Sequence, residues 1–278
     1  MSAAQRATGL PRPLRGPAPL VGRPYEQQPT RTMEVRPDPA HTLDAIREQL
    51  ANDNGGFVRN YPTPDPAKRR EIMGYHESLP ATHELARRFA VFNKYFCSVP
   101  GPTYPNRLFA LSGTSDGYAE NHNRYYRQPS VFRRLSEAQR PWHIYRGGIP
   151  ACVYLFWDMN TPEAMEHVWP MSTFFRDVAG DPAEFPAFSL IEPDYAENDD
   201  HPPHHLMAGQ RLIADVYNAL RVQRPRGSRR CSSSPTMSTA VSTITSVPPR
   251  RGPRPETPRV HLRPLRRPCA EAAGVSVD

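Results

Sequence analysis

The sequence predicts an α/β fold in which helices cover a mostly parallel sheet. First, strand-like apolar stretches alternate along the chain with stretches of helical spacing. Second, residues 151–157 read A-C-V-Y-L-F-W and are apolar throughout, as in a parallel strand buried on both faces. Third, residues 204–221 space their apolar side chains as one face of a long amphipathic helix.

Charge and proline content divide the 278 residues into three parts. Residues 1–32 are rich in Pro, Gly and Arg, and residues 222–278 form a basic tail rich in Pro, Ser and Arg, so both are expected to be disordered. The globular part is expected over residues 33–221. The net charge of +7 belongs to the tail, because residues 221–278 hold 12 Arg and three acids, a net of +9.

The composition also narrows the expected partners. The basic tail has no Lys and no aromatic side chain on which bases could stack, so no nucleic-acid partner is expected. No stretch reaches the roughly 18 apolar residues of a membrane span, so no transmembrane segment is expected. The N-terminal arginines are not followed by an apolar run, so no intact signal peptide is expected and the localisation stays open.

The first half of the globular part predicts two helices. Residues 43–50 carry Leu43, Ile46 and Leu50 at helical spacing, with Thr42 as a natural N-cap and residues 52–56 as the stop. Residues 80–92 predict a second helix. Its Leu85, Phe89 and Phe92 are expected to face a core.

The second half predicts alternating elements. Strands are expected at residues 107–112, 141–146, 151–157 and 188–191. Helices are expected at residues 129–137, around Phe174 and Phe175 toward Gly180, and at 204–221.

Residues 93–117 contain a proline-rich stretch that carries reactive side chains. Pro100, Pro102 and Pro105 predict a rigid loop, because proline neither continues a helix nor sits in a central strand. The loop presents Thr103, Asn106 and Arg107. A hydroxyl that can attack and a guanidinium that can hold two oxygens suit the binding of a phosphate group. A proline-rich surface turn with a solvated arginine is the alternative.

Residues 191–209 form a second constellation, in which acids and histidines crowd one loop between a strand and a helix. Ligands of α/β sheets bind in this kind of place. Imidazole beside carboxylate suits acid catalysis or metal ligation, and the alternative is a solvated acidic loop. The side chains concerned are Glu192, Asp194, Glu197, Asp199, Asp200, His201, His204 and His205.

Both constellations resemble one family. P-G-P-T-Y-P-N-R-L-F-A-L-S-G-T-S-D-G, S-L-I-E-P-D-Y and N-D-D-H-P-P-H resemble, in the same order, motifs of the bacterial phosphoesterase family, which includes phospholipases C and acid phosphatases. The resemblance implies an alkaline-phosphatase-like α/β/α sandwich. It implies that Thr103 is the nucleophile, that Asn106 and Arg107 bind phosphate, and that His201 acts at the leaving group. Supporting roles are implied for Glu192, Asp199 and Asp200.

The resemblance covers about residues 33–221 and is incomplete at both ends. The family's metal-binding Glu-Asn pair and its Y-D-E-H-G-G-F-Y-D-H-V segment have no counterpart in frame. The intact family implies a divalent metal ion, but no intact metal site is expected here. When codons are read one base earlier, residues 235–246 can encode the missing segment. A frame-shifted tail is therefore our hypothesis, with a genuine disordered extension as the alternative.

The function expected from the resemblance is hydrolysis of phosphate esters. The substrate would be phosphatidylcholine, a related phospholipid or a small phosphodiester, with activity impaired in this chain. The alternatives are a catalytically inactive remnant and a basic-tailed interaction protein.

Overall fold

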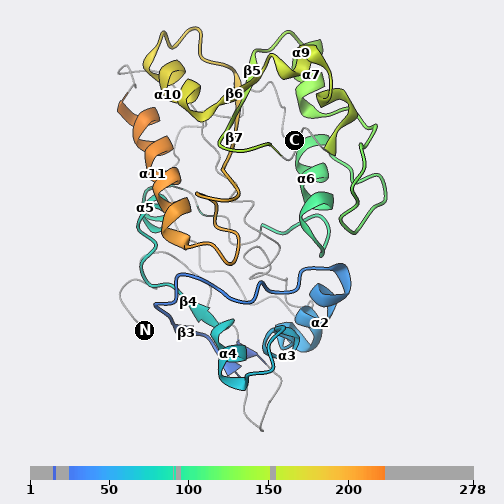
Figure 1. Ribbon diagram of the computed structural model, residues 1–278, viewed down its shortest axis with the longest axis vertical. Coiled ribbons are helices and arrows are strands. Elements are labelled where there is room, and N and C mark those ends of the chain that lie inside the picture. Colours follow the sequence, from blue (N-terminus) through green and yellow to red (C-terminus); the bar gives the residue numbers. More distant parts are fainter. Residues whose placement is uncertain (1–14, 17–24, 90, 92–94, 151–154, 223–278) are drawn as a thin grey trace, which may run out of the picture.

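The computed structural model describes residues 15–16, 25–89, 91, 95–150 and 155–222 (Figure 1). Its main sheet has three parallel strands in the order β6-β5-β7. Their bounds are β5 Trp142–Arg146, β6 Val168–Pro170 and β7 Phe188–Glu192. In the central strand, Ile144 pairs with Val168 on one side and with Leu190 on the other.

Alternation along β5 divides the core into two layers. Trp142 and Ile144 are buried against α6 (Thr103–Ser112) and α7 (Val131–Glu137), where Leu108 and Phe132 meet them. On the other face, Tyr145 is buried against α10 (Met171–Ala179) and α11 (Leu206–Val222). Burial of each large apolar side chain contributes about 1.5–3 kcal/mol.

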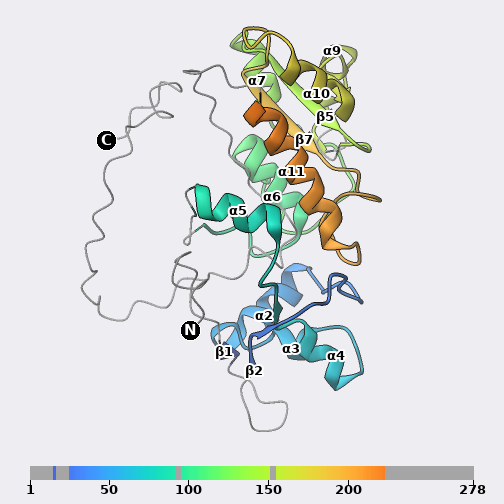
Figure 2. The same ribbon diagram turned by 90° about the vertical axis from the view of Figure 1, so that its left-hand side faces the viewer.

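The sheet therefore lies between two layers of helices (Figures 1 and 2). This confirms the predicted α/β class and the α/β/α layering with a parallel sheet. Among the described residues, no helix is both long and apolar enough to cross a membrane.

A smaller group of helices lies at the lower end of Figures 1 and 2. It contains α2 (Leu43–Asn54), α3 (Phe57–Asn60) and α4 (Pro66–Glu71). The Thr42 hydroxyl accepts from the backbone N–H of Ala45, as predicted for an N-cap. Asp65 caps α4 in the same way.

Part of the head differs from the disorder predicted for residues 1–32. β2 (Tyr25–Glu26) pairs with β1 (Arg15–Gly16), and β3 (Gln28–Pro29) pairs in parallel with β4 (Gly74–Tyr75). Thr30 N–H donates to the Tyr75 carbonyl at 2.9 Å. The partner of β3 comes from a distant segment, which composition alone does not reveal. The predicted disordered tail, beyond residue 222, lies outside the described residues.

The strand predicted at residues 107–112 is wrong, because these residues belong to helix α6. The apolar run L-F-A-L is short enough to fit a strand or a helix, so its spacing alone does not distinguish the two. Leu108 and Leu111 both face the core at helical spacing, and Gly113 ends the helix in the left-handed conformation at φ 74°.

The remaining elements agree with the prediction except at two places. Helix α5 (Pro80–Arg88) ends earlier than expected, and extended Phe89 is 52% exposed instead of facing a core. Phe92 and residues 151–154 of the apolar run lie outside the described residues. The described end of that run is not the predicted strand, because Phe156 makes only an isolated parallel bridge to Tyr126 and Trp157 begins η1 (Trp157–Met159). Helix α9 (Pro162–Met165) follows.

Candidate active site

Thr103 is the first residue of helix α6, so the prediction that a loop presents Thr103 and Asn106 is wrong: both lie in the first turn of the helix, and the loop ends at Pro102. Pro105 is tolerated there, because the first turn of a helix needs no internal N–H donor. The Tyr104 N–H, one of the unpaired donors of this turn, donates to Asn121 Oδ1 at 2.8 Å. Among the described residues, none hydrogen-bonds to the Thr103 hydroxyl.

The Asn106 side chain ties the proline loop to this first turn. Its Oδ1 accepts from the Val99 N–H at 3.0 Å, and its Nδ2 donates toward the carbonyls of Val99, Gly101 and Pro102 at 3.0–3.3 Å. An amide has only two N–H groups, and three carbonyl groups share them. Asn106 thus fixes the loop that leads into Thr103.

Arg107 and Glu192, both predicted site residues, lie together. Arg107 Nη1 is 2.6 Å from Glu192 Oε1, and the two side chains are 11% and 2% exposed. The Tyr195 hydroxyl accepts from Arg107 Nη2 and donates to Glu192 Oε2. This buried network ties α6 to the carboxyl end of β7. Removing one partner of such a pair typically costs about 3–5 kcal/mol, because it leaves a buried charge.

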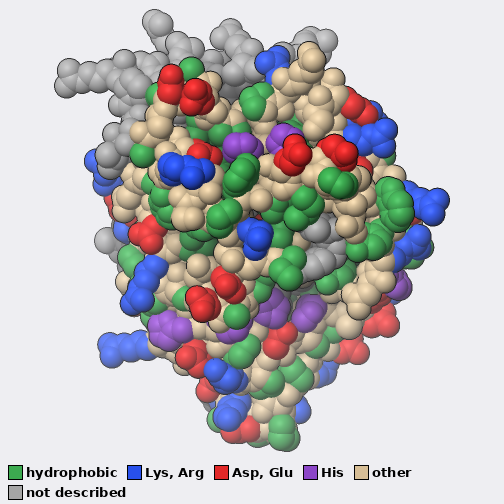
Figure 3. Space-filling view, turned by 45° about the horizontal axis from the view of Figure 1, so that its top comes forward, with side chains coloured by type: hydrophobic (Ala, Val, Ile, Leu, Met, Phe, Trp, Pro, Cys, Tyr) green, Lys and Arg blue, Asp and Glu red, His purple; other side chains and the backbone are tan. Residues whose placement is uncertain are grey.

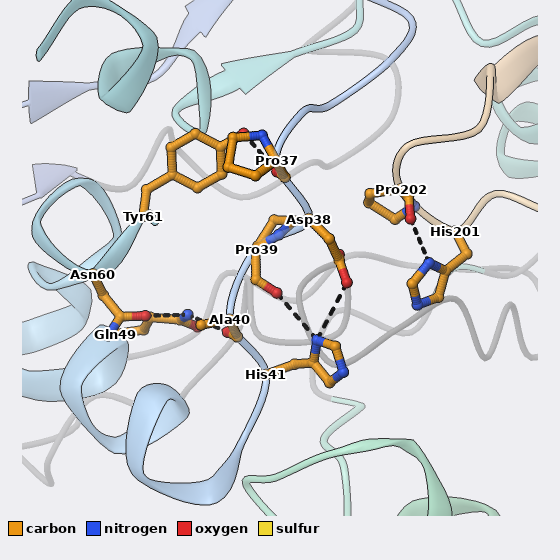
Figure 4. A network of polar contacts seen from close by, with 10 residues as sticks. All are labelled: Pro37, Asp38, Pro39, Ala40, His41, Gln49, Asn60, Tyr61, His201 and Pro202. Atoms are coloured by element: carbon orange, nitrogen blue, oxygen red, sulfur yellow. Dashed lines mark hydrogen bonds and ion pairs between the residues drawn. The ribbon is translucent and has the colours of Figure 1, made fainter. Parts of the chain in front are cut away.

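His201 lies beside a histidine that the sequence analysis missed. The rings of His41 and His201 are 6.2 Å apart, centroid to centroid, and perpendicular. His41 Nδ1 is 3.1 Å from the Pro39 carbonyl and 3.7 Å from Asp38 Oδ2, whereas His201 Nδ1 is 2.6 Å from the Pro202 carbonyl (Figure 4). Nothing in the spacing of the sequence marks His41, since 159 residues separate the pair.

The acids before His201 are buried close to histidine. Asp199 Oδ1 is hydrogen-bonded to the Nδ1 atom of His204, for which the family resemblance implies no role. Burial, and then the charge of Asp199, raises the pKa of Asp200 above its ordinary value. Asp199 Oδ2 and Asp200 Oδ1 are buried without a hydrogen-bond partner among the described residues. Figure 3 shows histidines and acids side by side on one face.

One loop connects the threonine side of the site with the histidine side. Glu120 Oε1 accepts from the Leu43 N–H at 2.8 Å and so caps α2, while the next residue, Asn121, caps α6. A Cβ atom on Gly101 would lie 3.7 Å from Leu43 Cδ1. The N-terminal ends of two helices therefore lie at the same loop, and side chains of that loop accept a hydrogen bond from each.

The described residues do not offer a complete metal site. Among them, no group of three or more His, Cys, Asp or Glu side chains is placed to hold a metal ion. Divalent ions of this kind need several oxygen or nitrogen ligands. The family is generally metal-dependent, but the residues described here do not fit that requirement.

Comparison with known families identifies the class of protein to which this fold and these motifs belong. A family profile, described as the Phosphoesterase family, matches residues 15–226, and the chain belongs to this family. The match starts within the segment that was expected to be a disordered head.

Individual relatives agree with that assignment. Non-specific phospholipase C6 of Arabidopsis thaliana is 30% identical over 208 residues, which is 67% of this chain and 39% of that protein. Non-specific phospholipase C1 of the same plant is 32% identical over 206 residues, 66% of this chain and 38% of that protein. The chain thus spans about two fifths of the length of these relatives. They are plant proteins, whereas the sequence resemblance was framed on bacterial ones.

Proposed function

We propose that the chain is a phosphoric ester hydrolase of the phospholipase C type, with Thr103 as its nucleophile. The supporting observation is the position of Thr103 at the N-terminal end of α6, behind a loop that Asn106 holds. The N–H groups and dipole of a helix N-terminus stabilise the negative charge of a phosphate group. The names of the plant relatives point to phospholipids as the substrate class.

In the proposed reaction, Thr103 Oγ1 gives its proton to solvent, attacks phosphorus and forms a phosphothreonine ester. The bond from phosphorus to the alcohol oxygen breaks, and the alcohol leaves with a proton that His201 donates. Water then attacks the same phosphorus atom and the bond from phosphorus to Thr103 Oγ1 breaks. The water oxygen leaves on the released phosphate ester, one water proton restores the Thr103 hydroxyl, and the other returns to His201. We assign His41 to the same centre, because its ring contacts that of His201 and its own Nδ1 faces Asp38.

The two predicted phosphate-binding side chains receive different roles in this proposal. Asn106 acts indirectly, because its amide groups are engaged with the loop backbone. Arg107 adds positive charge behind the first turn of α6, where Glu192 partly offsets it. Glu192, Asp199 and Asp200 support the site and are not assigned a proton transfer.

A catalytically inactive remnant is the second candidate, and one observation favours it. The described residues lack a set of ligands for the divalent ion on which the family generally depends. In that case the chain would bind phosphate esters without turning them over. Its phosphate-binding features would be unchanged.

Hydrolysis of p-nitrophenyl phosphorylcholine, with and without added divalent ions, tests the proposal. Thr103→Ala should abolish turnover, and mass spectrometry of acid-quenched protein should find phosphocholine on the peptide that contains Thr103. Thr114→Ala is the matched control, because Thr114 is an exposed threonine just beyond α6. Turnover that survives Thr103→Ala would refute Thr103 as the nucleophile. No turnover under any condition would favour the catalytically inactive remnant.

A further inference from the structure

Two large aromatic side chains are exposed side by side near the candidate site. Trp157 is 61% exposed and Tyr125 is 44% exposed, and their rings pack edge to face at 6.2 Å. The backbone explains why both rings are exposed on the same side. Tyr126 and Phe156 form a parallel bridge and are fully buried, so their neighbours Tyr125 and Trp157 turn outward together.

Positive charge flanks this pair. Residues 121–127 read N-H-N-R-Y-Y-R and contain two arginines and no acid. The Arg124 guanidinium lies over the rings of Tyr118 and Tyr126 at 5.0 and 5.5 Å, and Arg127 is exposed. The acid that follows Trp157, Asp158, turns inward and accepts from the Ser130 N–H.

The same segment begins at the candidate active site. Asn121, at its start, accepts from the Tyr104 N–H, directly after Thr103. His122 then packs against the Tyr118 ring at 5.0 Å. The segment that carries Arg124, Tyr125 and Arg127 therefore starts at the N-terminal end of α6.

We propose that the surface of Arg124, Tyr125, Arg127 and Trp157 docks on a phospholipid bilayer. Tryptophan and tyrosine favour the boundary between headgroups and acyl chains, because one end of each ring system is apolar and the other is polar. The arginines complement the phosphate oxygens of the headgroups. Docking in this way brings lipid headgroups to the end of α6 that carries Thr103. The purpose of docking, which is to bring headgroups to Thr103, rests on the proposed function. Binding to vesicles is measured without any turnover.

Vesicles of phosphatidylcholine with brominated acyl chains test where the chain docks. The full chain has three tryptophans, and of these Trp142 is only 2% exposed. Brominated vesicles should quench the fluorescence of Trp157. Quenching should be lost in Trp157→Phe and retained in Trp169→Phe, because Trp169 lies on β6 outside the proposed surface.

Co-sedimentation with the same vesicles supplies a second measurement. The Tyr125→Ala/Trp157→Ala variant should bind at least about tenfold more weakly, which corresponds to 1.4 kcal/mol. The matched control, Trp169→Ala/Phe175→Ala, removes two other exposed aromatic side chains and should bind as the unaltered chain does.

Three outcomes would overturn the proposal. They are no binding of the unaltered chain to vesicles, equal weakening in both double variants, and self-association that Trp157→Ala abolishes. Hydrolysis of soluble p-nitrophenyl phosphorylcholine separates the two proposals. A wrong docking surface leaves that hydrolysis intact, whereas a wrong nucleophile leaves vesicle binding intact.

Discussion

Single side chains of this protein hold the candidate site by bonds to the backbone as much as by contacts with one another. Asn106 shows this most clearly, because its amide bonds to four backbone groups of the loop before Thr103. The family resemblance implied a phosphate ligand at this position. The surrounding carbonyl groups favour a positioning role.

Asn106→Asp should therefore destabilise the chain. The substitution replaces an N–H donor with an oxygen that faces three carbonyl oxygens, and the loss should be about 2 kcal/mol or more. Urea denaturation measures the loss. Asn218→Asp, at an exposed position of α11, should change stability by less than about 0.5 kcal/mol. Equal stability of both variants would contradict the positioning role.

His143 should make stability depend on pH. Burial lowers the pKa of His143 below its ordinary value of 6.5, although Asp177 opposes the shift. Below pH 6.5 the unfolded chain therefore binds a proton that the folded chain does not yet bind, so stability falls as the pH drops. Stability rises again toward neutral pH.

His143→Gln should flatten this dependence between pH 5 and 7.5 in denaturant titrations. Burial also lowers the pKa of His76. His76→Gln should therefore remove a separate part of the dependence of the unfolding free energy on pH. If His143→Gln leaves the slope of the unaltered chain unchanged, the titration of His143 does not differ between the folded and unfolded states.

At the scale of elements, β7 ends at the site residue Glu192, and a glycine after β5 permits the close approach of the two strand ends. The Gly147 N–H donates to the Glu192 carbonyl at 3.0 Å. A Cβ atom on Gly147 would lie 2.5 Å from the Asp194 backbone nitrogen. A side chain at residue 147 would therefore push apart the loops that follow the two strands.

Gly147→Ala should destabilise the chain by about 1–3 kcal/mol, the usual cost of overpacking. Gly148→Ala is the matched control, because its nearest contact would be an ordinary 3.6 Å to Asp194 Oδ1. Thermal denaturation of the two variants compares them directly. A milder effect at residue 147 than at residue 148 would contradict this account.

Several elements were predictable from the sequence because their local signals agree. The alternation in W-H-I-Y-R, the Thr42 cap and the amphipathic pattern after His204 each specify an element without help from elsewhere. Helix α6 was not predictable, because its apolar residues fit a short strand equally well. Leu108 and Leu111 both pack in the core, and this contact stabilises the helix over the strand.

At the scale of the whole molecule, the described part is a three-layer domain that corresponds to about two fifths of its plant relatives. The hypothesis of a frame-shifted tail concerns residues 223–278, which lie outside the described residues. It remains a prediction about the gene.

Sequencing the DNA tests that hypothesis. The bases that encode residues 235–246 should spell Y-D-E-H-G-G-F-Y-D-H-V when each codon is read one base earlier. If the shifted frame does not spell this segment, the tail is a genuine extension. If the shifted frame does spell it, a chain with the restored frame should gain divalent-ion-dependent turnover of p-nitrophenyl phosphorylcholine.

The sequence by itself determined the family, the α/β class and the two groups of residues that carry the candidate chemistry. These depend on residue type and on order along the chain, which the sequence contains. Only the tertiary structure decided that Arg107 pairs with Glu192, that Asn106 holds the loop, and that His41 lies beside His201. Such contacts join residues far apart in sequence or depend on how the backbone turns, and only folding brings the partners together.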